Sequence, residues 1–197
     1  GGDGDEYAYT TAIDGSGNAY LTGFFSTTVD FDPGAGTANL TSAGSNDIFL
    51  AKYNASGNYV YAKSMGGTSL EIGRSIAIDG SGNAYITGNF QGTADFDPGA
   101  GTANLISAGN NDIFLAKYNA TGNYVFAKSI GSTGPDLGLS IAVDASGNAY
   151  ITGDFQGTVD FDPGAGTAYL TSAGFQDIFI AKYDASGNYV YAKSIGG

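Results

Sequence analysis

Three pairs of aspartates are the residues of this sequence whose type and spacing best suit binding chemistry. In each pair one residue separates the two aspartates and a Pro-Gly step follows: Asp30 with Asp32, Asp95 with Asp97, and Asp160 with Asp162. Side chains two apart on a strand point to the same side. Two carboxylates and the carbonyls of the following turn offer the hard oxygen ligands that Ca²⁺ prefers. Ca²⁺ is therefore the candidate cofactor, and these six aspartates are its candidate ligands.

A structural role is the alternative for the same six aspartates, and it requires no cofactor. Aspartates before a Pro-Gly turn accept hydrogen bonds from the amides of the turn. The chain also has six lysines, all at repeated positions within apolar segments: Lys52, Lys63, Lys117, Lys128, Lys182 and Lys193. A lysine among apolar residues needs an acidic partner because an unpaired buried charge is costly. The six aspartates are matched by six lysines, which favours turn capping and lysine pairing over a metal site.

The segment Asp14–Asn18 (DGSGN) has oxygen-bearing side chains at its first, third and fifth positions, as an EF-hand calcium loop does. An EF-hand is excluded, because Ala19 stands where the loop needs glycine and Phe25 stands where it needs glutamate. The pattern instead predicts an Asx-type turn that closes a hairpin. The GSGN and GAGT segments are turns as well, since no helix follows them to complete a phosphate-binding loop.

Catalytic chemistry is poorly supported by the composition. The chain has no cysteine and no histidine, which excludes Ser-His-Asp and Cys-His mechanisms and ordinary zinc catalysis. Paired carboxylates also suit glycoside hydrolysis, but that reaction needs two carboxyls in different environments. Here the same pair occurs three times, so we expect a protein that is not an enzyme.

The charge balance of the 197 residues limits the partners. A formal net charge of -12 opposes binding to nucleic acid and to anionic membrane surfaces. No segment approaches the roughly 20 apolar residues of a membrane span, so membrane insertion is not expected. The first residues lack the basic and apolar regions of a secretory signal, and we expect any export signal to have been removed.

All of these residues belong to a unit of 65 residues that occurs three times. The segment Asp14–Tyr20 recurs at Asp79–Tyr85 and at Asp144–Tyr150, and the DFDPG and DIF segments follow the same step. The chain therefore divides into three repeats: residues 1–65, 66–130 and 131–197.

Each repeat is expected to hold two β-hairpins. In the middle repeat, Ser75–Asp79 and Asn83–Phe90 flank a Gly-Ser-Gly loop, and Asp112–Asn119 and Tyr124–Ile130 flank a second short loop. Such runs predict four antiparallel strands in each repeat. No window shows a sustained apolar period of 3.6 residues, so the fold class is all-β.

The segment between the two hairpins is the insertion that carries the aspartate pair. Its Thr93–Phe96 and Asn104–Ser107 can pair as a small ribbon around the Pro98-Gly99 turn, and its Pro and Gly exclude a helix.

The strand that begins at Asp112 is apolar on both faces. Ile113 and Leu115 lie on one face, and Phe114 and Ala116 lie on the other. Such a strand needs cover on both sides. A four-stranded sheet packed between two similar sheets supplies that cover, and radial stacking of four-stranded blades is how β-propellers achieve it.

The repeat resembles the bacterial β-propeller repeat named SBBP. The resemblance rests on the pattern I-A-x-D-x-S-G-N-A-Y-x-T-G, then G-T-x-D-F-D-P-G, then D-I-F-x-A-K-Y, and it covers essentially the whole chain. Related propeller repeats such as NHL have a similar hairpin. The resemblance implies secreted or surface-anchored bacterial proteins with non-catalytic roles in scaffolding, adhesion or ligand binding.

The repeats depart from a usual propeller in length and in number. The unit of 65 residues exceeds the roughly 40–45 of a usual blade, and the excess is the DFDPGAGT insertion. Propellers close with about 4–8 blades, more than the three found here. We expect self-association to complete the ring, with a dimer supplying six blades; the alternative is an open helical array of blades, as in a filament or a longer native array.

The function expected from the sequence is that of a non-catalytic extracellular or cell-surface module, a scaffold or adhesin. Its expected partner is a second copy of itself, in a closed ring or in a head-to-tail filament. A glycan or a surface protein is a further candidate partner. The alternative function is a carbohydrate-binding or Ca²⁺-dependent propeller that acts as a lectin.

Overall fold

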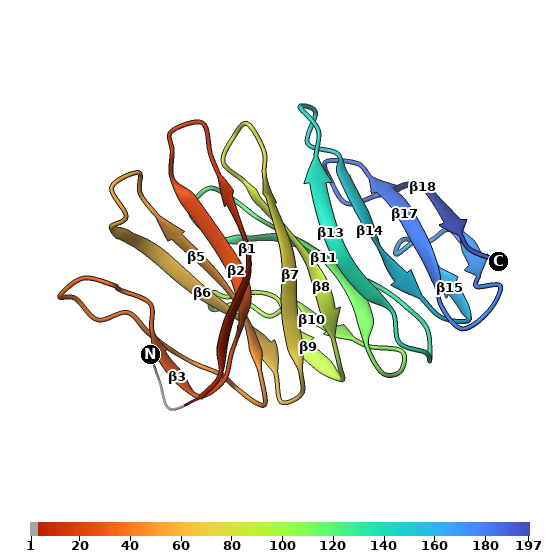
Figure 1. Cartoon of the computed structure of the whole chain (residues 1–197), viewed down its shortest axis with the longest axis horizontal. Helices are drawn as coiled ribbons and strands as arrows, with labels where there is room; N and C mark the ends of the chain where they lie inside the picture. Colours follow the sequence, from red (N-terminus) through yellow and green to blue (C-terminus); the bar gives the residue numbers. More distant parts are fainter. Residues whose placement is uncertain (1–3) are drawn as a thin grey trace.

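A computed structural model describes residues 4–197, which form eighteen strands and no helix (Figure 1). The predicted all-β class is confirmed. Twelve of the strands form three antiparallel sets of four, one set for each repeat. Sheet 1 contains β1 (Glu6–Ile13), β2 (Ala19–Phe25), β5 (Asp47–Tyr53) and β6 (Tyr59–Gly67). Sheet 2 contains β7 (Glu71–Ile78), β8 (Ala84–Phe90), β11 (Asp112–Tyr118) and β12 (Tyr124–Ile130). Sheet 3 contains β13 (Leu137–Val143), β14 (Ala149–Phe155), β17 (Asp177–Tyr183) and β18 (Tyr189–Ile195).

Each set is built from the two predicted hairpins, whose middle strands pair with each other. The strand β7 begins at Glu71 rather than at Ser75, because a register shift between Gly73 and Ser75 lets the pairing with β8 continue. Gly88 lies opposite Gly73, and a Cβ on Gly88 would be 1.9 Å from the carbonyl oxygen of Ile72. Only glycine fits this close approach of the two strands.

The insertion of each repeat forms the predicted small ribbon. The three ribbons pair β3 (Thr28–Asp30) with β4 (Asn39–Thr41), β9 (Thr93–Asp95) with β10 (Asn104–Ile106), and β15 (Thr158–Asp160) with β16 (Tyr169–Thr171). The second ribbon also pairs with β6 through Gly66 and Gly67, so sheet 1 has six strands. The insertion of the second repeat thus extends sheet 1, whereas the β3–β4 and β15–β16 ribbons form separate two-stranded sheets.

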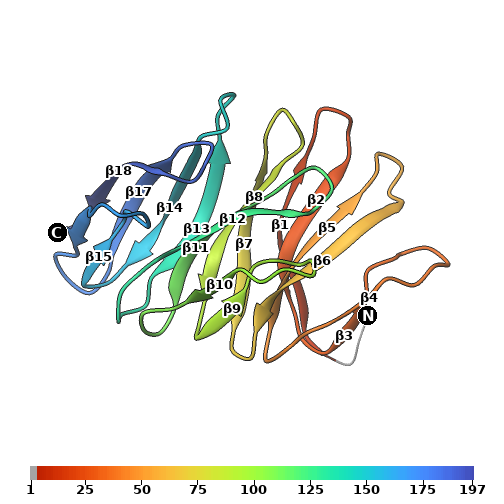
Figure 2. The ribbon, with the colours of Figure 1, turned by 180° about the vertical axis from the view of Figure 1, so that it is seen from behind.

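The three sheets stand side by side in a row (Figures 1 and 2). Strand β7 packs against β1 and β2, and β13 packs against β7 and β8. Sheet 1 lies at one end of the row and sheet 3 at the other, so residues 4–197 do not close into a ring. No helix in this part of the chain could cross a membrane.

The apolar core lies between neighbouring sheets. Phe114, Ala116 and Tyr118 belong to the cluster between sheets 1 and 2, whereas Ile113 and Leu115 belong to the cluster between sheets 2 and 3. Sheet 2 is therefore covered on both faces, as the sequence of β11 predicts. A third, smaller cluster lies where sheet 1 packs on its own ribbon, and includes Phe25, Val29, Phe49, Ala51 and Ala62.

Candidate functional site

The aspartate pairs cap the turn of the ribbon. Asp30 Oδ1 accepts hydrogen bonds from the amides of Asp32 (3.0 Å) and Ala38 (2.8 Å), and Asp32 Oδ1 accepts one from the amide of Gly34 (2.8 Å). The amides of Ala38 and Asp32 lower the pKa of Asp30. The other two repeats contain the same three bonds, made by Asp95, Asp97, Asp160 and Asp162. These contacts support the structural interpretation of the pairs.

The lysines do not take these aspartates as ion-pair partners in the described residues. The ion pairs are instead Lys52 with Asp14 and Lys182 with Asp144, each at 3.9 Å. The predicted lysine partners were therefore wrong, because the hairpin loop lies nearer to the lysine than the ribbon does. Within residues 4–197, no three acidic, histidine or cysteine side chains gather as a metal site. A Ca²⁺ site at the aspartate pairs stays a prediction.

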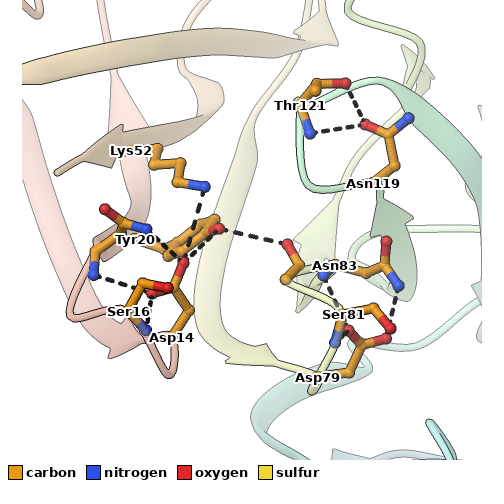
Figure 3. Close-up of polar contacts among 11 residues, drawn as sticks. Asp14, Ser16, Tyr20, Lys52, Asp79, Ser81, Asn83, Asn119 and Thr121 are labelled. Carbon is orange, nitrogen blue, oxygen red and sulfur yellow. Dashed lines mark hydrogen bonds and ion pairs between the residues drawn. The ribbon is translucent and has the colours of Figure 1, made fainter.

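An aspartate, a lysine and a tyrosine meet at the hairpin end of sheet 1 (Figure 3). In sheets 2 and 3 a lysine ammonium lies over a tyrosine ring in the same way. Asp14 Oδ1 accepts hydrogen bonds from the amides of Ser16 (2.9 Å) and Asn18 (3.0 Å), which confirms the predicted Asx-type turn. The ammonium of Lys52 lies 3.9 Å from Asp14 Oδ2 and 4.6 Å from the centre of the Tyr20 ring. The lysine charge is therefore balanced by a carboxylate and an aromatic face.

The same groups link each sheet to the next. The Tyr20 hydroxyl donates to the carbonyl of Gly82 at 3.4 Å, and the Tyr85 hydroxyl donates to that of Gly147 at 3.0 Å. The ammonium of Lys117 donates to the carbonyl of Ala185 at 3.1 Å. Burial raises the pKa of Tyr85 to about 12, so this tyrosine stays a hydrogen-bond donor at neutral pH. The arrangement therefore joins neighbouring sheets.

Two polar recesses open between successive hairpin ends. The first, of about 350 Å³, is lined among others by Asp14, Ser16, Lys52 and Ser81. The second, of about 270 Å³, occupies the same position between sheets 2 and 3. Their hydroxyl, carboxylate and ammonium groups suit a small ligand rich in hydroxyls.

Two buried carboxylates meet where sheet 1 joins sheet 2. Asp47, which begins β5, is 3% exposed, and Glu71, which begins β7, is 0% exposed. Asp47 accepts bonds from the Ala43 amide and the Ser64 hydroxyl, and Glu71 Oε2 accepts the Gly67 amide at 2.8 Å. Among the described residues, Glu71 Oε1 has no hydrogen-bond partner. Burial raises the pKa of Glu71 to about 7, and the charge of Asp47 adds to the rise.

A second acidic pair, Asp112 and Asp136, occupies the junction between sheets 2 and 3. Asp112 Oδ2 accepts the Ala108 amide at 3.0 Å, and Asp136 accepts the amides of Ser132 (2.7 Å) and Gln156 (2.9 Å). Burial raises the pKa of Asp112 to about 6, and the charge of Asp136 adds to the rise. These pairs were not predicted from the sequence, although it contains a signal for them: an acid recurs at the 65-residue step in Glu6, Glu71 and Asp136.

The outer side of sheet 3 exposes apolar side chains that are buried in the other sheets. We call it the open face of sheet 3 and define it by Tyr150, Ile178, Ile180, Lys182, Tyr191 and Ile195. Ile178, Ile180 and Ile195 are 49%, 37% and 59% exposed. Their counterparts in sheets 1 and 2 are at most 2% exposed, namely Ile48, Leu50, Met65, Ile113, Leu115 and Ile130.

Stacked four-stranded antiparallel sheets that share one strand order are the building units of propeller-like proteins. Residues 66–92 match the model of the SBBP family, described as a beta-propeller repeat. This stretch contains the β7–β8 hairpin and its DGSGN turn. The resemblance predicted from the motifs is confirmed by this match.

Two curated proteins are similar to most of the chain. An uncharacterized WD repeat-containing protein, L264, of Acanthamoeba polyphaga mimivirus is 29% identical over 185 residues, which is 86% of this chain and 13% of the relative. The regulatory protein FlaEY of Caulobacter vibrioides is 29% identical over 170 residues, which is 82% of this chain and 17% of the relative. The chain thus spans less than a fifth of either relative. Since one relative is viral, the similarity does not assign the chain to bacteria.

Proposed function

We propose that the chain is a non-catalytic structural module of the β-propeller type that associates end to end with a second copy of itself. It serves as a scaffold or adhesin outside the cell or on the cell surface. Two copies bring six blades together, which suits a closed ring, whereas a rotation that does not close produces a filament.

The open face of sheet 3 is the observation that carries this proposal. Its three isoleucines are 37% to 59% exposed, while the same repeat positions are buried at both internal interfaces. Full burial of an isoleucine side chain is worth roughly 1.5–3 kcal/mol relative to exposure. The corresponding faces of sheets 1 and 2 are each covered by the next sheet. We therefore infer that the open face of sheet 3 forms a third interface of the same kind, with another copy of the chain.

Light scattering on the chromatographed protein tests the proposal. We expect a dimer or a larger assembly at high protein concentration and a monomer for the Ile178→Asp, Ile180→Asp double variant. Ile106→Asp is the matched control, because Ile106 is 71% exposed but lies on a ribbon away from the open face. A monomer at every concentration would contradict self-association.

A ligand-binding propeller is the second candidate function, and the polar recesses between the hairpin ends favour it. In this alternative each recess binds one sugar residue of a glycan. A glycan array probed with the purified protein tests it. Ser81 lines both recesses, so Ser81→Leu should abolish binding at both. An array without hits would contradict glycan binding, and only the structural function would remain.

Ca²⁺ dependence belongs to the same alternative and has its own test. If the aspartate pairs bind Ca²⁺, millimolar Ca²⁺ should raise the melting temperature of the native chain, and EDTA should reverse the rise. The Asp95→Asn, Asp97→Asn variant should lose part of that response. If these carboxylates only cap turns, the melting temperature is the same in Ca²⁺ and in EDTA, while the variant still melts earlier because charge-assisted hydrogen bonds weaken.

A further inference from the structure

The tip of the second hairpin of a sheet holds an aromatic ring of the preceding sheet. Gly122 (φ +76°) lies on the β11–β12 loop, and a Cβ added there would be 2.8 Å from the ring of Tyr61 on β6. Gly187 (φ +79°) lies on the β17–β18 loop, and its Cβ would be 2.7 Å from the ring of Phe126 on β12. Both glycines are buried, so at each internal interface one aromatic ring packs against one loop glycine.

Sheet 1 has a loop glycine that holds no ring, and sheet 3 has an aromatic ring that no loop glycine holds. Gly57 is the matching glycine on the β5–β6 loop; it is exposed, and a Cβ there would meet nothing within 4 Å. A cavity of about 460 Å³ lies beside it, lined by Asp32 to Ala35 and Gly57 to Tyr59. Tyr191 is the matching aromatic on β18, and it belongs to the open face of sheet 3.

The polar contacts of the internal interfaces also join side-chain donors of one sheet to backbone carbonyls of the next. Tyr85 and Lys117 of sheet 2 donate to carbonyls of sheet 3, at 3.0 Å and 3.1 Å. Their counterparts on the open face are Tyr150 and Lys182, and the counterparts of the accepting carbonyls belong to Gly17 and Ala55 at the hairpin ends of sheet 1.

We propose that Tyr191 of one copy occupies the cavity beside Gly57 of a second copy, in the register of the internal interfaces. This inference rests on the proposed self-association and adds its register: a head-to-tail contact in which sheet 3 meets sheet 1. In that register Tyr150 and Lys182 donate to the carbonyls of Gly17 and Ala55 of the second copy. The contact is heterologous, so each copy offers one ring and one cavity.

Chemical cross-linking between single-cysteine variants tests the register, because the chain has no cysteine of its own. Lys193→Cys leaves the Tyr191 ring in place, because Lys193 is exposed and lies two residues beyond it on β18. This variant is mixed with Ser56→Cys and treated with a short bismaleimide, and covalent dimers are read on a denaturing gel. Thr121→Cys replaces Ser56→Cys in the control. Thr121 is exposed and has the same repeat position, but its neighbour Gly122 already holds Tyr61.

We expect several-fold more cross-linked heterodimer with Ser56→Cys than with Thr121→Cys. Equal yields in an associating sample would overturn the proposed register and leave self-association standing. Light scattering of the same mixtures separates the two cases, since an absence of association at all concentrations contradicts both proposals.

A second set of variants tests the ring itself without cross-linking. Tyr191→Phe should keep the native affinity, because Phe126 fills this role at an internal interface. Tyr191→Ala should weaken association by about tenfold or more, as truncation of an aromatic anchor does. An unchanged affinity for Tyr191→Ala would show that Tyr191 is not seated in the second copy.

Discussion

Thr27 adopts a backbone conformation that the other two repeats give to glycine. Its φ is 61°, and the matching residues are Gly92 (φ 63°) and Gly157 (φ 78°). The left-handed region costs a residue with a side chain roughly 1–2 kcal/mol, because Cβ approaches the following carbonyl oxygen. The first repeat therefore carries local strain at the entry to its ribbon.

Thr27→Gly should raise the free energy of unfolding by roughly 0.5–1 kcal/mol, since the loss of strain exceeds the entropy that glycine gains in the unfolded chain. Urea denaturation measures the change. The reciprocal variant, Gly157→Thr, should lower stability by roughly 1–2 kcal/mol, because its φ is 78° and no neighbour lies within 4 Å to compensate. A destabilised Thr27→Gly protein would show that Thr27 makes a contact worth more than its strain.

At the scale of elements, the strand starts of β5 and β7 bring two acids of different sheets together. Glu71 is 0% exposed and faces the carboxylate of Asp47, while its own carboxylate accepts a hydrogen bond from the Gly67 amide. Asp47 accepts a hydrogen bond from the Ser64 hydroxyl. The second junction repeats this with Asp112 and Asp136, beside the hydroxyls of Ser129 and Ser132. In both junctions, therefore, the pKa of one acid is higher in the folded protein than in the unfolded chain.

This burial makes the stability of the fold depend on pH. Since the pKa of Glu71 rises from 4.5 to about 7, its favourable contribution is complete below pH 4.5 and is lost as the pH rises through 7. We expect the free energy of unfolding to fall by about 3 kcal/mol for this residue between pH 4.5 and pH 8. Denaturation curves across this range measure the fall.

Glu71→Gln should remove most of that dependence and make the protein more stable than the native chain at pH 8. Glu6→Gln is the matched control, because Glu6 has the same repeat position and is exposed. The control should keep the native pH profile, which separates the junction from the general repulsion of an acidic chain. Identical profiles for the native chain and Glu71→Gln would show that Glu71 is not the group responsible.

At the scale of the molecule, the net charge of -12 opposes the contact between copies that the open face favours. The apolar attraction acts at short range, whereas the charge repulsion acts over the Debye length. The balance between them decides at which concentration the copies associate.

Salt should therefore strengthen self-association. Raising the ionic strength from about 0.1 M to about 1 M shortens the Debye length from ~10 Å to ~3 Å and screens the repulsion between copies. Sedimentation equilibrium at both ionic strengths should give a lower dissociation constant at the higher one. A dissociation constant that rises with salt would indicate that ion pairs, rather than apolar contacts, hold the copies together.

The sequence alone determined the repeats, the hairpins, the ribbon and the Asx turn at Asp14. These features depend on contacts between residues close in the chain, such as the amides of Ser16 and Asn18 on one carboxylate. Strand alternation likewise showed that β11 needs cover on both faces. Local chemistry and periodicity are sufficient for inferences of this kind.

Only the tertiary structure decided which distant side chains meet. Lys52 pairs with Asp14 and not with a ribbon aspartate, because strand pairing sets β5 beside β2 and brings the lysine to the hairpin end. Asp47 and Glu71 converge only when two sheets pack, and no local pattern contains that contact. The exposure of the open face of sheet 3 is likewise seen only in the structure, because its residue types match those of the buried faces.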